Sequence, residues 1–142
     1  MACLNDGEFA RWMRSARATL ESARADLESG FYNWACFKAH QATEKALKAV
    51  LWGAGRPAVG HSLVALATEV ERLGLEVPAD VREHCYALSK YYTITRYPDA
   101  WESGAPEDYF TRREAEEAIS AAERVLAWVE GVWRGLRGRE RS

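Results

Sequence analysis

Two stretches of this 142-residue sequence carry side chains suited to holding an anion or an aromatic base. Gln41, Glu44 and Lys48 recur at spacings of three and four, which on a helix places their amide, carboxylate and ammonium groups on one face. Arg96 and Tyr97 stand together immediately before a proline. A guanidinium holds phosphate oxygens through parallel hydrogen bonds, and a tyrosine ring stacks on a base. We expect the two stretches to share one groove between adjacent helices and to bind a ligand there.

A second interpretation of the same residues is structural, and the sequence leaves it open. Glu44 and Lys48 have the spacing of an ion pair on a helix surface, worth about 0.3 kcal/mol. Tyr91, Tyr92 and Tyr97 are equally typical of core residues that keep their hydroxyl groups in water. In that case the polar residues fix the register of the helices and bind nothing.

Metal and cofactor chemistry has little support in the residue pattern. His40, His61 and His84 fall in three different predicted elements, and no two of them have the spacing of a ligand pair on a helix. The glycine-rich segment at residues 53–60 lacks the lysine and hydroxyl residue of a phosphate-binding P-loop, and it follows a helix rather than a strand. We therefore expect no metal site and no cofactor.

The composition is typical of a protein from a reducing compartment. Cys3, Cys36 and Cys85 are odd in number and have no metal-ligand spacing, so we predict free thiols. The first residues lack the apolar run of a signal peptide, and no segment has the unbroken apolar length of a membrane span. These features predict a cytoplasmic protein that does not bind membranes. The formal net charge of −2 provides no overall attraction to nucleic acid.

The elements that position these residues are predicted to be helices, because apolar residues repeat every three or four positions almost throughout. Glycines, prolines and capping residues divide the chain into five segments. Four are long and the third is short; they span about residues 6–28, 31–52, 61–73, 78–96 and 111–136. We predict an all-α, up-and-down bundle of one domain over residues 1–142. Its core covers about residues 6–136, and residues 137–142 form a frayed basic tail.

Small side chains line one face of the second predicted helix. They recur every three or four residues, at Ala35, Ala39, Ala42, Ala46 and Ala49. Small residues allow another helix to approach closely, so we expect this face at the centre of the bundle. The polar groups beside it would then be held partly out of water.

Four motifs in chain order resemble the HEPN domain family (higher eukaryotes and prokaryotes nucleotide-binding), in its stand-alone prokaryotic type. Residues 40–51, HQATEKALKAVL, are similar to the signature of the family's second helix. Residues 30–37 partly match its G-x-Y-x-x-A-x-F pattern, residues 61–63 match its H-x-L motif, and residues 96–98 match its R-Y-P motif. The resemblance covers about residues 8–130. It implies an HEPN-like helical bundle that forms a two-fold dimer.

The resemblance also implies two kinds of activity. Many HEPN domains are metal-independent ribonucleases, often toxins, with an arginine followed about four to six residues later by a histidine near the end of the fourth helix. Others are non-catalytic, binding nucleotides or serving as interaction modules, and some have a minimal nucleotidyltransferase as antitoxin partner. In this chain no histidine follows Arg96, because His84 is the last one. That departure argues against an enzyme of the usual type.

Three hypotheses for the function follow. In the first, the chain is a non-catalytic or weakly active HEPN module that forms a homodimer and binds a nucleotide or a partner protein, such as a minimal nucleotidyltransferase in a toxin–antitoxin-like pair. Its ligand-binding residues would be Gln41, Glu44, Lys48, Arg96 and Tyr97. In the second, it is a metal-independent ribonuclease toxin with a rearranged active site, in which His61 and Arg96 act on RNA. In the third, it is purely a dimerisation module.

Overall fold

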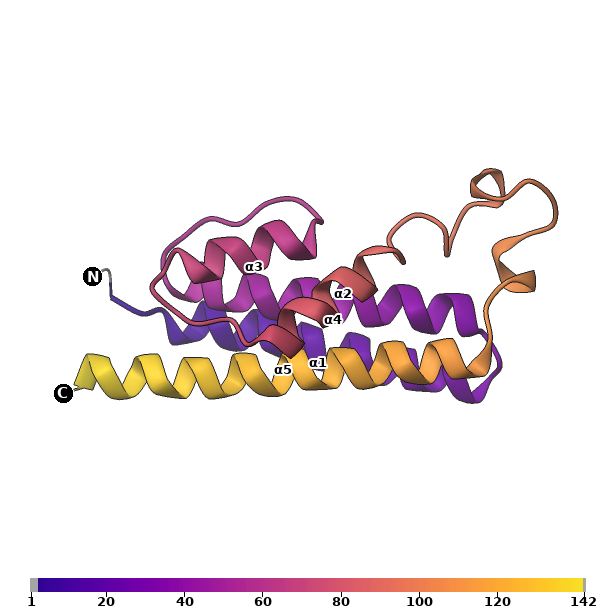
Figure 1. Ribbon diagram of the computed structural model, residues 1–142. Coiled ribbons are helices and arrows are strands. Elements are labelled where there is room, and N and C mark those ends of the chain that lie inside the picture. Colours follow the sequence, from indigo (N-terminus) through magenta and orange to yellow (C-terminus); the bar gives the residue numbers. More distant parts are fainter. Residues whose placement is uncertain (1–2, 142) are drawn as a thin grey trace.

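The structure, a computed structural model that describes residues 3–141, is built from helices (Figure 1). Its α-helices are α1 (Asp6–Glu28), α2 (Tyr32–Gly53), α3 (Leu63–Glu71), α4 (Ala79–Ser89) and α5 (Arg112–Arg141). Two short 3-10 helices, η1 (Pro98–Ala100) and η2 (Pro106–Asp108), lie in the loop before α5. Residues 3–141 contain no strand, so the predicted all-α bundle is confirmed. Within the same range, no helix is long and apolar enough to cross a lipid bilayer.

Three long helices form the frame of the molecule. In Figure 1, α1, α2 and α5 run side by side, and the two ends of the chain lie at the same end of the bundle. The turn between α1 and α2 reverses the chain at Gly30, whose φ of 83° is a left-handed conformation that glycine adopts without strain. The shorter helices α3 and α4 contact each other and pack against α2.

α2 lies at the centre of the bundle, with its small-residue face fully covered. The alanines predicted to form that face are each 0% exposed: Ala35, Ala39, Ala42, Ala46 and Ala49. At the end of α2, a Cβ added to Gly53 would lie 2.6 Å from Cη2 of Trp133, whose ring stacks on Phe9 with centroids 4.3 Å apart. The close helix approach predicted from the small residues is therefore confirmed.

The fourth helix is shorter than predicted, because α4 ends at Ser89 and residues 90–96 continue as turns. Two side chains there bond to the carbonyl groups that a continuing helix would use. Thr95 Oγ1 donates to the Tyr91 carbonyl at 2.7 Å, and Arg96 Nε donates to the Tyr92 carbonyl at 2.9 Å. Such side-chain bonds compete with the helical backbone pattern. Within residues 3–141, the bundle therefore has three long α-helices and two short ones, rather than four and one.

The last helix is longer than predicted, because α5 continues past residue 136 to Arg141. Contacts with the start of the chain hold the extra turns. Arg137 Nη1 lies 2.5 Å from Asp6 Oδ2, and Glu140 accepts a 2.8 Å hydrogen bond from the backbone N–H of Leu4. The tail predicted to fray is thus helical as far as Arg141, and Ser142 lies outside the described residues.

The segment that carries Arg96 is anchored on α2 by a buried asparagine. Asn33, 1% exposed, donates hydrogen bonds from Nδ2 to the Thr95 carbonyl at 3.0 Å and to Glu107 Oε2 at 3.1 Å. The indole of Trp101 donates to the Ile94 carbonyl at 2.8 Å. These bonds fix the irregular chain after α4 against the bundle.

Candidate functional site

The buried carboxylate of Glu44 on α2 contacts two side chains, those of Lys48 and His61. Glu44 is 5% exposed; its Oε2 lies 3.2 Å from Nζ of Lys48, and its Oε1 lies 3.0 Å from Nδ1 of His61. Lys48 is 8% exposed, and its ammonium faces the ring of Trp12 on α1 at 5.9 Å. The predicted Glu44–Lys48 pair therefore exists, but it is buried between helices rather than on the surface.

His61 joins this pair to a group of aromatic rings. Its side chain, 52% exposed, stacks on Tyr92 with ring centroids 4.6 Å apart and an interplanar angle of 19°. The guanidinium carbon of Arg96 lies 4.7 Å from the centre of the same Tyr92 ring, 4.3 Å from that of Phe37 and 4.9 Å from that of Tyr97. We call these five residues, Phe37, His61, Tyr92, Arg96 and Tyr97, the Tyr92 cluster.

Gln41 is hydrogen-bonded to a second histidine, His40, which is buried. Its Oε1 lies 3.1 Å from Nδ1 of His40, which is 1% exposed and has its ring centroid 5.3 Å from that of Tyr92. Burial lowers the pKa of His40 below its ordinary value, because a charged imidazolium would lose its hydration. The hydrogen bond with Gln41 and the charge of Glu44 oppose that shift without reversing it. Gln41 therefore supports the inner side of the site.

An open pocket of about 390 Å³ adjoins the cluster. Its lining residues are His61, Ser62, Ser89, Lys90, Tyr92 and Thr93. Neither Glu44 nor Arg96 lines this pocket, and the two are connected through His61 and Tyr92. The structure thus brings the predicted residues into one continuous set of contacts along α2, with the accessible part formed by rings and a guanidinium.

The sequence identified Tyr92 only as one of three tyrosines near Arg96, and it did not predict that this ring contacts both His61 and Arg96. The spacing of Tyr92 and Arg96, four residues, was a usable signal, because it places both on one face of a helical turn. Arg56 precedes His61 by five residues but is not part of the Tyr92 cluster. Arg56 lies 3.6 Å from Glu69 Oε2 on α3, while His61 is bound to Glu44.

No three His, Cys, Asp or Glu side chains in the described part of the chain are grouped so as to hold a metal ion.

The sequence as a whole matches one family. The model of the HEPN domain family covers residues 9–132, so this chain belongs to the HEPN domain family. A human protein, sacsin, is 32% identical over 99 residues, which are 67% of this chain and 2% of sacsin. The chain therefore spans a very small part of that relative's length.

Solved structures of similar proteins have the same fold. A protein from Thermus thermophilus is 42% identical, with a TM-score of 0.84 over 87% of this chain and 96% of that one. An archaeal HEPN homologue is 39% identical, with a TM-score of 0.73 over 87% and 95% of the two chains. A HEPN domain protein from Thermotoga maritima is 37% identical, with a TM-score of 0.72 over 87% and 98%.

Proposed function

We propose that this chain is a non-catalytic or weakly active HEPN module that binds a nucleotide at the Tyr92 cluster. The observation that carries the proposal is the guanidinium of Arg96 set among aromatic rings, beside Tyr97, which is 48% exposed. An exposed ring offers a base a stacking surface, and Arg96 offers a phosphate a fixed positive charge. Nε and Nη2 of Arg96 donate to the Tyr92 carbonyl, which holds the group in place and leaves Nη1 for the ligand.

The buried residues of α2 support the site from within. Glu44 and Lys48 neutralise each other, and both are nearly inaccessible to solvent. Their role in the proposal is to orient His61, which in turn packs on Tyr92. Gln41 has the corresponding role toward His40. A ligand phosphate would therefore contact Arg96 rather than Lys48.

Calorimetric titration of the purified chain with ATP, GTP and AMP tests this proposal. We expect saturable heat for at least one of the three, and binding weakened about tenfold or more in Arg96→Gln, as for a lost charge-assisted hydrogen bond. Tyr97→Ala should also weaken binding, whereas Tyr86→Ala is the matched control, because Tyr86 is a 58% exposed tyrosine on α4 outside the cluster. No heat at millimolar ligand would refute nucleotide binding. Arg96→Gln that lowers only the melting temperature would favour the purely structural hypothesis.

The proposal includes a homodimer and a partner protein. Phe31 and Trp34, at the start of α2, are 52% and 36% exposed, and exposed aromatic side chains favour protein contacts. We propose a two-fold dimer, and a minimal nucleotidyltransferase as the partner in a toxin–antitoxin-like pair. Light scattering after gel filtration should give twice the mass of a single chain, which is 16.0 kDa. A monomer at micromolar concentration would remove the dimer from the proposal.

The second candidate function is a metal-independent ribonuclease, and the Glu44–His61 hydrogen bond favours it. A carboxylate bound to Nδ1 fixes the orientation and tautomer of an imidazole, and leaves Nε2 to accept or donate a proton at the substrate. Arg96, which contacts the same Tyr92 ring, would stabilise phosphoryl charge. This arrangement uses His61 in place of the histidine that is missing after Arg96.

Incubation with structured RNA in EDTA tests the second candidate. If His61 is the acid–base group, His61→Ala and Arg96→Ala each abolish cleavage, and His84→Ala, a histidine on α4 outside the cluster, retains it. Cleavage that persists in His61→Ala would exclude this mechanism. The absence of any cleavage by the unmodified chain would exclude the ribonuclease.

A further inference from the structure

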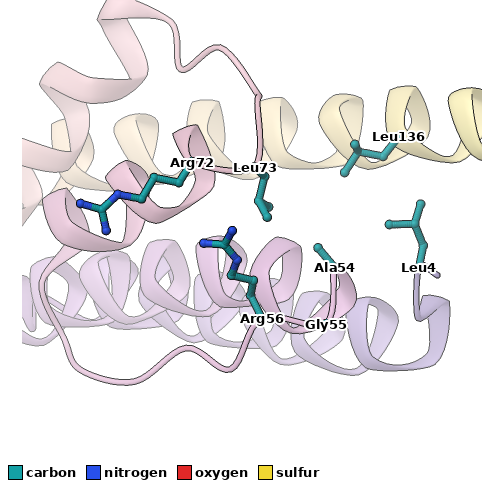
Figure 2. A pocket seen from close by; sticks show the side chains of 7 residues that line it. All are labelled: Leu4, Ala54, Gly55, Arg56, Arg72, Leu73 and Leu136. Carbon is teal, nitrogen blue, oxygen red and sulfur yellow. The ribbon is translucent and has the colours of Figure 1, made fainter. Parts of the chain in front are cut away.

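A pocket of about 340 Å³ opens at the end of the bundle where the two chain ends lie (Figures 1 and 2). It is formed by the residues before α1, the turn after α2, the end of α3 and the last turns of α5. Its lining residues are Leu4, Ala54, Gly55, Arg56, Arg72, Leu73 and Leu136. Its size is near the lower end of the range for small-molecule sites, about 300–1,000 Å³. None of these residues belongs to the Tyr92 cluster.

The pocket has an apolar part and a cationic part. Figure 2 shows Leu4, Leu73 and Leu136 around the hollow, with the guanidinium group of Arg56 at one side of it and that of Arg72 farther out on the same side. Apolar side chains provide a surface for a hydrocarbon body, and guanidinium groups bind a carboxylate through charge-assisted hydrogen bonds. The two parts therefore suit a ligand with one anionic end.

The charges at the mouth of the pocket leave an excess of positive charge on the arginine side. Arg56 and Arg72 share a single carboxylate, that of Glu69, which lies 3.6 Å from Nη1 of Arg56 and also pairs with Arg72. At the opposite side, the Glu140 carboxylate accepts a hydrogen bond from the backbone of Leu4. An anionic head group is thus attracted to the arginine side and repelled from the Leu4 side, which sets the direction of the ligand.

We propose that this pocket binds a small amphiphilic carboxylate, with its head group at Arg56, on the side where Arg72 adds a second positive charge, and its apolar chain against Leu4, Leu73 and Leu136. The carboxylate contacts the Arg56 guanidinium, whose contact with Glu69 is long at 3.6 Å, and Glu69 stays paired with Arg72. The apolar chain displaces water from the leucine side chains. The proposal does not depend on the function assigned to the Tyr92 cluster.

Binding is measured by NMR titration of the isotope-labelled chain with octanoate, and the matched probes are octanol, octylamine and acetate. We expect saturable shifts of the Gly55 and Leu73 amide signals with octanoate, and affinity at least about tenfold lower for octanol, because it lacks the charge. Acetate should bind weakly, because it lacks the chain, and octylamine should not bind. Equal affinity for octanoate and octanol would overturn the proposal, and so would the absence of shifts at about 10 mM octanoate, roughly tenfold above a Kd of about 1 mM.

Variants separate this pocket from unspecific binding of an amphiphile. Arg56→Gln and Arg72→Gln should each lower octanoate affinity about tenfold and leave octanol affinity unchanged. The control is Arg113→Gln, because Arg113 is 86% exposed and lies in the first turn of α5, at the opposite end of that helix from Leu136. Ala54→Phe, which fills the hollow, should abolish binding of both probes. Equal octanoate affinity in Arg56→Gln and Arg113→Gln would refute the assignment of the head-group site.

Discussion

His61 and Glu44 are joined by a hydrogen bond of 3.0 Å between Nδ1 and Oε1, although His61 lies in a loop and Glu44 is buried within α2. The same carboxylate pairs with Lys48 through its second oxygen. A charge removed from water is tolerated only when it is paired and hydrogen-bonded. Glu44 therefore connects the stability of the bundle to the position of the one histidine in the Tyr92 cluster.

Glu44→Ala is expected to destabilise the protein by about 3 kcal/mol, because it leaves the Lys48 ammonium buried without its partner. Urea denaturation followed by circular dichroism measures the loss. Glu44→Met combined with Lys48→Met should recover most of it, since replacing both charges by apolar groups removes the unpaired one. The matched control is Glu21→Ala on α1, whose carboxylate pairs with Arg24 in an exposed contact. Equal losses for the two alanine variants would contradict the buried-pair interpretation.

Gly53→Ala is expected to destabilise the protein by about 1–3 kcal/mol through overpacking. The new Cβ would lie 2.6 Å from the Trp133 ring, which is itself held by stacking on Phe9. Gly135→Ala on α5 is the control, because its added Cβ meets no heavy atom within 4 Å apart from its chain neighbours and the backbone of its own helix. It should stabilise the helix by about 0.5–1 kcal/mol, the usual difference between glycine and alanine. Thermal unfolding of both variants, with changes of opposite sign, checks the close approach of α2 and α5.

Local sequence patterns predicted the bundle well, because each helix has an apolar periodicity and clear end signals. α1 spans residues 6–28 as predicted, and the buried alanines of α2 follow from spacing alone. The end of α4 could not be read in this way. The turns after Ser89 depend on side chains that bond to the carbonyls of Tyr91 and Tyr92, and on the Asn33 contact from a distant helix.

The candidate site was only partly predictable for a similar reason. The polar residues of α2 were identified from their spacing, and their partial burial was expected from the small residues beside them. The contact between Lys48 and Trp12 of α1 follows from no spacing rule. The Glu44–His61 bond likewise joins residues seventeen positions apart through the path of a loop. Contacts between elements are set by how the helices pack, and a single sequence records only the period of each helix.

The three cysteines are expected to differ sharply in reactivity. Cys36 and Cys85 are buried, and burial raises the pKa of their thiols to about 12 and about 11, respectively. The thiolate is the reactive form, so neither should react at pH ~8 in the folded protein. Cys3 is exposed. A coloured disulfide reagent should therefore titrate one thiol in the native protein and three in denaturant, and none in native Cys3→Ser. Rapid modification of a second thiol in the native state would contradict the packing of α2 and α4.

His40 should make the folded protein less stable as the pH falls below about 6.5, the ordinary pKa of histidine. Its pKa in the folded state is lowered by burial, so the unfolded chain takes up a proton that the folded chain does not. The contribution of His40 to the free energy of unfolding is therefore fully present above the pKa of histidine in the unfolded chain. It is lost as the pH falls from that value to the lower pKa of His40 in the folded protein. The slope reaches at most ~1.4 kcal/mol per pH unit for one proton.

Urea denaturation at a series of pH values isolates the contribution of His40. The series runs from about pH 7.5 to about pH 5, which spans the ordinary pKa of histidine. His40→Asn keeps a donor near Nδ1 for Gln41 but does not titrate, so it should remove the part of the slope that belongs to His40. His84→Gln is the control, because His84 lies on α4 outside the contacts of Tyr92. A pH dependence that is unchanged in His40→Asn would show that His40 is not the titrating group. A loss of slope in His40→Asn alone would connect acid sensitivity to the buried side of the Tyr92 cluster.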